Sequence, residues 1–371
     1  MDRTIGVSSL ASASTGRFSV QVLDAAVPEE RRAWLEQWRR WPGREIMAHP
    51  DYGRLFARPC DRLVCVSART ARGGILYPLL VRPLAAEPWS GGTGDEVDLA
   101  TPYGYGGPFA WNVDPDEASH FWLGLDAWAE SCRAVTAFTR LALFPERLLP
   151  FHGDLVEGGP NVVVRLDGSE EDLWRRHAGK VRQNVRRARG QGVTVEIDPE
   201  GRRLDDFFDV YAETMERRGA LAQYRFSRAF FEALFGDLGD DCRLLHARAG
   251  GRVVSSELLL LSADVAYAFL GGTRAEAFAL RPNDLLKHEE MRYARSLGRR
   301  GLVLGGAYKP GDELLRYKAA FDPGGLVPFR LGVRTFDPET SLRLTERRRA
   351  WERLQGRTWS PSQPFFPPYR S

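Results

Sequence analysis

The sequence is poor in cysteine and shows no cysteine pattern. Only 4 of its 371 residues are cysteines, and they include no C-x-x-C pair and no histidine at zinc-ligand spacing. These cysteines are Cys60, Cys65, Cys132 and Cys242. The spacing argues against a disulfide framework and against a structural zinc site. We expect buried, reduced thiols and no bound metal.

Long apolar runs are also absent. The longest, "LLLLSADVAYAFL", is broken by Ser262 and Asp264, so it is too short and too polar to predict a transmembrane helix. The first residues, "MDRTIGVSSLASASTGRF", lack the apolar core of a signal peptide. These features predict a cytoplasmic protein without a membrane span.

The common motifs of catalytic nucleophiles are missing as well. The chain has no G-x-S-x-G, H-x-x-x-D or H-E-x-x-H motif, and none of its 6 histidines lies near a plausible nucleophile in the sequence. Enzymes that need no nucleophile of their own include those that align an amine with an activated ester or thioester. Alignment alone can contribute roughly 7–11 kcal/mol to such a reaction. A cation or a backbone N–H would then stabilise the oxyanion.

The length of the chain predicts more than one domain. A chain of 371 residues exceeds the size at which one hydrophobic core usually stops growing. Strand and helix patterns alternate, and the order begins again near Val156. We predict an α/β (α+β) protein with domains at 1–156 and 157–337. A charged helix and a Pro-rich tail follow at 338–371.

Two segments of the chain resemble each other. "CVSARTARGGILYPLLV" and "LLHARAGGRVVSSELLLL" share a strand that ends in Ala-Arg, a Gly-Gly turn and a second apolar strand. Antiparallel hairpins are common, so the likeness can arise by chance. If it reflects a duplication, the chain holds two copies of an α/β unit with a cleft between them.

One segment concentrates positive charge. Between Arg175 and Arg189 there are seven Lys or Arg residues and no carboxylate, although the formal net charge of the chain is only +3. An apolar stripe at helical spacing predicts one helix through the segment; its members are Trp174, Ala178, Val181, Val185 and Ala188. The charge fits a solvated face near a helix C-terminus. The lack of interspersed Glu favours a phosphate-bearing partner, with Arg182 and Arg186 as contacts.

Two further features of this basic segment bear on the partner. It contains no aromatic residue, which favours phosphate contact over base stacking. Arg187, Gly190 and Gly192 match R-x-x-G-x-G, the pyrophosphate loop of acetyl-coenzyme A enzymes. That loop must open a helix so that free N–H groups face phosphate. Here the glycines are predicted to close one, so we treat the match as accidental.

The second half of the chain resembles a known family. The segments "KVRQNVRRARGQGVTVEI", "VYAETMERRGALAQYRFSRAFFEAL", "FLGGTRAEAFALRPNDLLKHEEMRYARSLG" and "LGGAYKPGDELLRYKAAFDPGG" are similar to the Fem family and its GNAT-like relatives. "TPYGYGGPF" is similar to the Gly/Pro-rich loop of their first domain. The resemblance extends to about Asp337. It implies two tandem GNAT-like domains with mixed, largely antiparallel sheets.

The same resemblance implies an activity. Its members are acyltransferases that form an amide bond, here from aminoacyl-tRNA to an amine on a peptidoglycan precursor or a small metabolite. Acyl-coenzyme A is the alternative donor, and either donor is a co-substrate, with no further cofactor expected. A non-catalytic RNA- or anion-binding protein is the second alternative. The chain lacks the coiled-coil arm of some members, so we expect no tRNA contact through such an arm.

The resemblance also points to individual residues. Lys318 in "RYKAAF" matches the lysine of the family's F-K-x-x-F motif, which is implied in charge stabilisation at the acyl centre. Lys180 and Arg182 match the K-x-R start of the basic segment, and Arg218 and Tyr224 lie where relatives bind the acceptor. Without the resemblance, Lys318 would be read as an exposed helix lysine.

Four other residues are candidates from their surroundings. Glu257 lies in the apolar run "SSELLLL"; it is either a buried acid of raised pKa that takes a proton from the amine, or an exposed strand residue. Asn283 follows Pro282 at a predicted helix start, where it binds a ligand or only caps the helix. Tyr103 and Tyr105, spaced by glycines, line a cleft or stabilise a turn.

Overall fold

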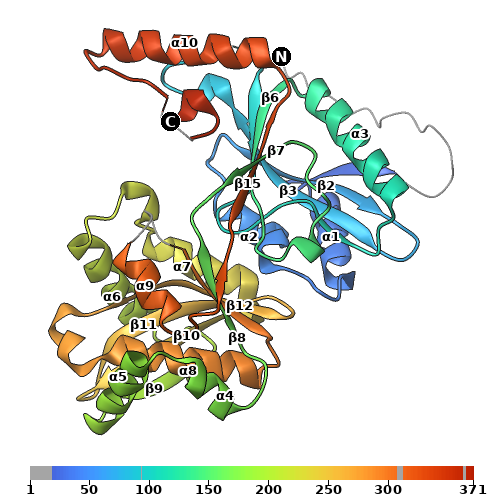
Figure 1. The fold of residues 1–371 in the computed structure, drawn as a ribbon. Coiled ribbons are helices and arrows are strands. Elements are labelled where there is room, and N and C mark those ends of the chain that lie inside the picture. Colours follow the sequence, from blue (N-terminus) through green and yellow to red (C-terminus); the bar gives the residue numbers. More distant parts are fainter. Residues whose placement is uncertain (1–18, 93, 307–311, 362–364) are drawn as a thin grey trace.

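The chain folds around two mixed β-sheets. The computed structural model describes residues 19–92, 94–306, 312–361 and 365–371. Each sheet has helices on both faces (Figure 1). The predicted α/β class with two tandem units is confirmed.

The first sheet has the strand order β1-β2-β3-β4-β6-β15-β7, with β5 paired to β3. All neighbours are antiparallel except β4 and β6. The strands are β1 (Val20–Asp24), β2 (Arg62–Arg69), β3 (Gly74–Pro83), β4 (Val97–Ala100), β5 (Phe109–Trp111), β6 (Ala134–Arg140), β7 (Asp154–Glu157) and β15 (Arg330–Thr335).

The second sheet has the order β14-β8-β13-β12-β11-β10-β9. Its one parallel pair is β12 with β13. The strands are β8 (Asn161–Arg165), β9 (Thr194–Asp198), β10 (Cys242–Ala249), β11 (Arg252–Leu261), β12 (Val265–Thr273), β13 (Gly301–Gly305) and β14 (Leu326–Val327).

The two sheets share one topology. Each begins with four antiparallel strands, continues with one parallel neighbour and ends with two antiparallel strands. The two similar sequence segments occupy the same place in this scheme, as the hairpins β2–β3 and β10–β11. Their likeness in sequence therefore matches an equivalence in topology.

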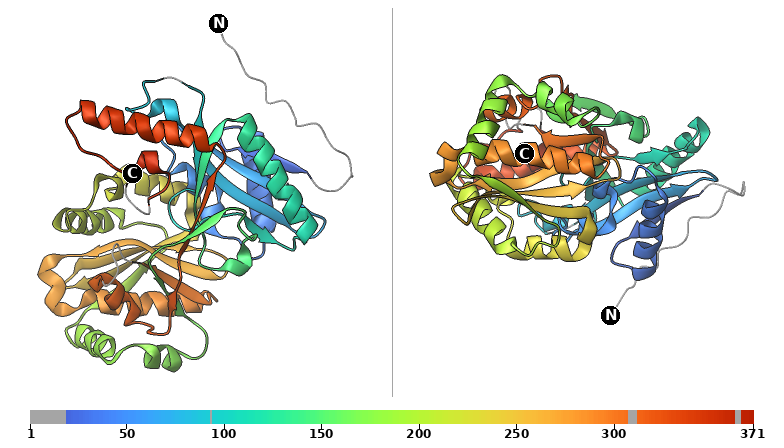
Figure 2. Two further views of the ribbon diagram at one scale, coloured as in Figure 1. Left: turned by 45° about the horizontal axis from the view of Figure 1, so that its top comes forward. Right: turned by 90° about the horizontal axis from the view of Figure 1, so that it is seen from below.

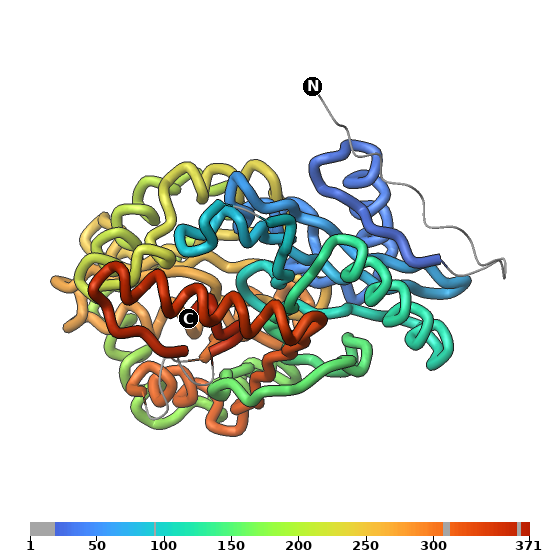
Figure 3. The backbone as a smooth tube through the Cα atoms, turned by 90° about the horizontal axis from the view of Figure 1, so that it is seen from above, coloured from blue at the N-terminus to red at the C-terminus, as the bar shows by residue number. Residues whose placement is uncertain are grey.

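The end of the chain returns to the first sheet. Strand β15 lies within the segment predicted as the second domain, yet it pairs with β6 and β7 (Figure 1). Helix α10 (Pro338–Leu354) follows and faces the viewer in Figure 3. Beside it, Tyr369 is fully buried against Trp89. The predicted boundaries at 156 and 337 stay a prediction, but this pairing ties residues 330–335 to the first sheet.

Helices cover both faces of each sheet. In the first unit, α1 (Pro28–Arg40) and α2 (Pro50–Arg54) cover one face and α3 (Pro115–Ser131) the other. In the second unit, one face carries α4 (Glu170–Arg176), α5 (Gly179–Gly190), α8 (Pro282–Ser296) and α9 (Glu313–Ala319). The opposite face carries α6 (Leu204–Arg217) and α7 (Arg228–Leu238), as the right view of Figure 2 shows.

The single helix predicted through the basic segment is wrong, because the chain breaks into α4 and α5 at His177 and Ala178. Both residues have extended backbones there. The His177 ring hydrogen-bonds the carbonyl of Phe321, and the Ala178 N–H donates to the carbonyl of Ala320. These tertiary hydrogen bonds replace helical ones and override the local pattern. Gly190 and Gly192 do close α5, as predicted.

A buried polar cluster joins the two units. Glu45, in the first unit, is 1 % exposed and accepts hydrogen bonds from Arg147 and from Tyr267 of β12. Burial raises the pKa of Glu45, against the opposing effect of Arg147. The Ile46 N–H also donates to the Ser262 hydroxyl at 2.9 Å. These contacts fix β12 against the first unit.

Within the described ranges, no helix combines the length and apolarity needed to cross a membrane.

Candidate functional site

The centre of the second sheet opens where two neighbouring strands part. Strands β12 and β13 run parallel, but they pair only from Val265 to Tyr267 on β12. Beyond Tyr267, β12 continues to Thr273 along β11, and no described strand pairs with its other edge. The half-buried residues 268–272 line this opening. We call it the β12–β13 cleft. A strand edge of this kind offers backbone N–H groups to a developing oxyanion.

Lys318 lies at the β13 side of the cleft. Its ammonium donates to the Gly306 carbonyl at 2.8 Å. A side chain beginning at Gly305 would lie 3.4 Å from the Tyr105 hydroxyl and 3.5 Å from the Lys318 nitrogen. Burial lowers the pKa of Lys318 to about 8, and the charge of Lys287 acts in the same direction. Lys318 is half-buried, so it is not the exposed helix lysine that the sequence alone favours.

Glu257 lies at the β12 side of the cleft. It is 8 % exposed, so the exposed alternative is wrong. One oxygen is 2.6 Å from the Lys287 ammonium, and the other lies over Gly271, 2.1 Å from where a Cβ would be. Lys287 also binds Glu290 at 3.2 Å. Burial raises the pKa of Glu290, and the charge of Glu257 adds to this rise.

Lys287 and Glu290 were missed by the sequence analysis. Both lie on α8, three residues apart, so they project from one helix face. Burial alone would lower the pKa of Lys287, but Glu257 and Glu290 outweigh burial and hold that pKa above its usual value. A lysine and a glutamate at this spacing are typical of a solvated helix, so only their burial distinguishes them.

The start of α8 carries a second group of polar contacts. Asn283 donates to the Tyr317 hydroxyl at 2.8 Å, which connects α8 to the helix of Lys318. Asn184 of α5 donates to Asp284 at 3.0 Å. Burial raises the pKa of Asp284, while the nearby Lys180 acts in the opposite direction. Lys180 itself is exposed. Asn283 makes no side-chain cap on α8, so the capping alternative is wrong.

The three candidate tyrosines gather at the junction of the two units. Tyr105 donates to the Asn161 side chain at 2.7 Å and stacks on Tyr267. Tyr103 has its ring 6.3 Å from that of Tyr224 and 6.1 Å from that of Phe269 on β12. Tyr103 and Tyr105 therefore border the cleft from the first unit, and Tyr224 lies beside Tyr103 on the second unit. Arg218 is exposed at the end of α6.

The basic segment is less free than the sequence predicts. Arg182 donates to the carbonyls of Arg175 and His177 and so caps the end of α4. Arg189 lies 2.7 Å from Glu289 of α8. The guanidinium of Arg186 lies 5.3 Å from the ring centre of Trp174. Acids and an aromatic ring from other elements therefore supply partners that the segment itself lacks.

A Ser-His-Asp group is formed by buried side chains of β11, β10 and β9. His246 hydrogen-bonds the Ser256 hydroxyl at 2.8 Å, and its other ring nitrogen is 3.6 Å from Asp198. His246 and Ser256 are both fully buried. Asp198 also accepts backbone N–H groups of Arg202 and Arg203. A substrate cannot reach this serine, so the group cross-links β9, β10 and β11. The sequence gives no sign of the contact, because it depends on strand register.

Among the residues that the structure describes, no three His, Cys, Asp or Glu side chains gather where they could hold a metal ion. An ammonium, a strand edge and a buried carboxylate surround one opening. This arrangement suits stabilisation of a tetrahedral oxyanion and removal of a proton from an amine.

Residues 175–319, which include the cleft, match the family described as the acetyltransferase (GNAT) domain. The second unit therefore contains a GNAT-type acetyltransferase domain, and the two-unit fold of the chain is Fem-like. The resemblance stated from the sequence is therefore confirmed.

Solved structures share the fold over most of the chain. The crystal structure of FemX has a TM-score of 0.59 and 15% identity, covering 83% of this chain and 94% of that one. The C-terminal domain of a protein described as a lysylphosphatidylglycerol synthetase from Agrobacterium fabrum has a TM-score of 0.50 and 15% identity, covering 82% of this chain and 92% of that one. L-PGS from Bacillus licheniformis has a TM-score of 0.51 and 13% identity, covering 85% of this chain and 94% of that one. No curated protein sequence matches the chain.

Proposed function

We propose that the chain transfers an aminoacyl group from aminoacyl-tRNA to an amine acceptor, on a peptidoglycan precursor or a small metabolite. The observation that carries the proposal is the β12–β13 cleft, with Lys318 on one side and Glu257 on the other. The amine nitrogen attacks the ester carbonyl carbon, a C–N bond forms, and the C–O bond to the ribose breaks. The leaving ribose oxygen takes up a proton.

Each step has a group in the cleft to support it. The negative charge that develops on the carbonyl oxygen meets the Lys318 ammonium and the free edge of β12. Glu257 accepts the proton that the amine loses, and Lys287 stabilises the Glu257 carboxylate until that transfer. Tyr105 and Asn161 limit the space beside Gly305 and so position the ester.

The helix that follows β12 favours an aminoacyl-tRNA donor over acyl-coenzyme A. The turn from Arg274 to Arg281 contains no glycine, and helix α8 carries the buried acid Asp284 in its first turn. A pyrophosphate bound at a helix N-terminus needs free N–H groups and close backbone approach, and a carboxylate there opposes it. The exposed basic residues of α5 instead offer contacts to an RNA backbone.

Related structures support the same donor. One neighbour of the same fold is described as a lysylphosphatidylglycerol synthetase, a name that refers to a lysyl group, and another is FemX. Identities of 15% carry the fold only, so these names support the proposal without extending to this chain by themselves.

Product analysis tests the donor directly. The full chain is incubated with a mixture of charged tRNAs or with acyl-coenzyme A, each with a panel of amines, and the products are identified by mass spectrometry. We expect aminoacylated amines from the tRNA reactions alone. Products from acyl-coenzyme A alone would overturn the donor. RNA binding without any product would favour the non-catalytic alternative.

A further inference from the structure

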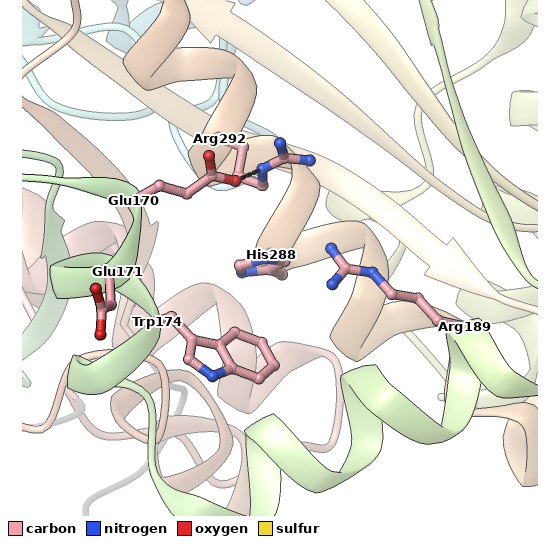
Figure 4. Close-up of a pocket in the computed structure, with 6 residues that line it drawn as sticks. All are labelled: Glu170, Glu171, Trp174, Arg189, His288 and Arg292. Carbon is pink, nitrogen blue, oxygen red and sulfur yellow. Dashed lines mark hydrogen bonds and ion pairs between the residues drawn. The ribbon is translucent and has the colours of Figure 1, made fainter.

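A pocket of about 440 Å³ lies outside the β12–β13 cleft, between α4, α5 and α8 (Figure 4). We call it the Trp174 pocket. Its lining residues are Glu170, Glu171, Trp174, Arg189, His288 and Arg292. None of them takes part in the proposed chemistry. Figure 4 shows Trp174, His288 and Arg189 facing one another across the opening.

Hydrogen bonds of His177 and His288 determine which ring nitrogens carry protons beside the pocket. The Phe321 carbonyl can only accept, so the hydrogen bond of 2.8 Å to His177 Nδ1 requires a proton on that nitrogen. His177 Nε2 is then an acceptor in the neutral ring. His288 Nδ1, 3.0 Å away, must donate to it. Burial lowers the pKa of both rings, that of His288 to about 4, so both are neutral at pH 7.

The remaining nitrogen of His288, Nε2, is therefore a bare acceptor. His288 is 3 % exposed and lines the pocket, and no hydrogen bond to its Nε2 occurs in the described part of the chain. A ligand N–H that enters the pocket can donate to this nitrogen. Nε2 is thus the acceptor that His288 offers to a ligand in the pocket.

The pocket walls carry matched charges and an aromatic ring. Arg292 pairs with Glu170 and Glu289, and Arg189 pairs with Glu289. These ion pairs leave no excess cation for a free anion. The Trp174 ring borders the pocket beside His288, 5.1 Å between ring centres. The ligand that suits such a lining is a neutral planar ring with both donors and acceptors on its edge.

We propose that the Trp174 pocket takes the base of one unpaired nucleotide of an RNA. The base stacks beside Trp174 and donates an N–H to His288 Nε2, while exposed arginines of α5 contact the phosphates. This inference rests on the proposed aminoacyl-tRNA donor. It also revises the expectation of phosphate contact alone, since Trp174 precedes the basic segment by one residue.

The test uses the full chain and short fluorescein-labelled single-stranded RNAs, measured by fluorescence anisotropy. In a series of RNAs, each base in turn is removed while its sugar and phosphate stay. We expect one position at which base removal weakens binding roughly ten-fold. The variant Trp174→Leu should bind the intact RNA roughly ten-fold more weakly and should no longer respond to base removal at that position. Trp174→Phe should restore most of the affinity.

Trp359→Leu is the matched control. Trp359 is also half-buried and also has an arginine over its ring, Arg348 at 5.7 Å, but it lies on the C-terminal tail. This variant should bind like the wild type. Ultraviolet cross-linking of the wild type, with peptide mass spectrometry, gives a readout without any substitution. The cross-linked peptide should contain Trp174 or His288.

The possible failures are distinguishable. Equal affinity for every abasic RNA, or a cross-link elsewhere, would overturn the nucleotide pocket and leave the tRNA donor in place. A Trp174→Leu variant that still responds to base removal would do the same. A wild type that binds no RNA would overturn the donor and the pocket together.

Discussion

The Lys287 ammonium lies 2.6 Å from a carboxylate oxygen of Glu257, and both side chains are buried. The lysine comes from α8 and the glutamate from β11, so the pair holds this helix on the sheet. Removing one partner of a buried ion pair leaves an uncompensated charge. The pair therefore stabilises the fold and orients Glu257 toward the cleft.

We predict that Lys287→Met lowers the free energy of unfolding by about 3–5 kcal/mol. Glu257 and Glu290 would then face each other in a buried space without a cation. Urea unfolding at pH 7 measures the change. In the double variant Lys287→Met/Glu257→Leu, part of the loss should be recovered, because an apolar pair needs no charge compensation. Equal stability of the single variant and the wild type would contradict the prediction.

Arg147 should stabilise the junction of the two units as strongly as Lys287 stabilises the contact between α8 and the sheet. It compensates the buried Glu45 and also lies 3.3 Å from Asp264. We expect Arg147→Met to lower the unfolding free energy by about 3–5 kcal/mol in the same assay. Arg300→Met is the matched control, because Arg300 also lies 3.3 Å from Asp264 but is 76% exposed. That variant should change stability by less than about 1 kcal/mol.

The buried serine near His246 should be structural. Ser256→Ala removes a hydroxyl that donates or accepts inside the sheet. We expect a loss of about 1 kcal/mol in stability and an unchanged kcat. The measurement is the initial rate of aminoacyl transfer by the purified variant at a temperature well below its unfolding. A drop in kcat of a hundred-fold or more would mean that the serine is a nucleophile after all.

The rate should depend on pH through Lys318. Its pKa is lowered to about 8 by burial, and the proposed role needs the protonated form. The kcat should therefore be highest below pH 8 and fall as pH rises through about 8. The variant Arg316→Ala, an exposed cation on the same helix, should keep this profile. A wild-type rate that stays constant from pH 7 to about 9.5 would contradict the assignment.

The lowered pKa of Lys318 also makes the stability of the fold depend on pH. The pKa of Lys318 is lower in the folded state than the ordinary lysine value of about 10.4. Protonated Lys318 thus disfavours folding, fully below pH 8, and the penalty disappears as pH rises toward 10. Lys318→Met should be more stable than the wild type at pH 7, with an advantage that shrinks between pH 8 and 10. Thermal unfolding across this range measures it.

Much of the fold could be predicted from the sequence. Apolar alternation and glycine turns located the β2–β3 and β10–β11 hairpins, and Pro28 located the start of α1. The break between α4 and α5 could not be predicted, because it depends on hydrogen bonds to Ala320 and Phe321, far along the chain. Local pattern determines an element only where tertiary contacts do not oppose it.

The site was predictable only in part. The family motif singled out Lys318, and the apolar strand singled out Glu257. The cleft itself depends on where β12 and β13 stop pairing, which is a property of sheet twist and register. The sequence did not show that Lys287 and Glu290 are buried or that Trp174 lines a pocket, because each has an ordinary place in a helical pattern.

The most direct test of the central claim is the kinetics of Lys318→Ala with aminoacyl-tRNA as donor. If the Lys318 ammonium stabilises charge that develops only in the transition state, kcat should fall by about 10²–10³ while the Kd for the donor stays nearly unchanged. Lys318→Arg should restore little, because a planar guanidinium cannot replace the ammonium beside Gly306. A loss of donor affinity with unchanged kcat, or full activity of the alanine variant, would contradict this mechanism.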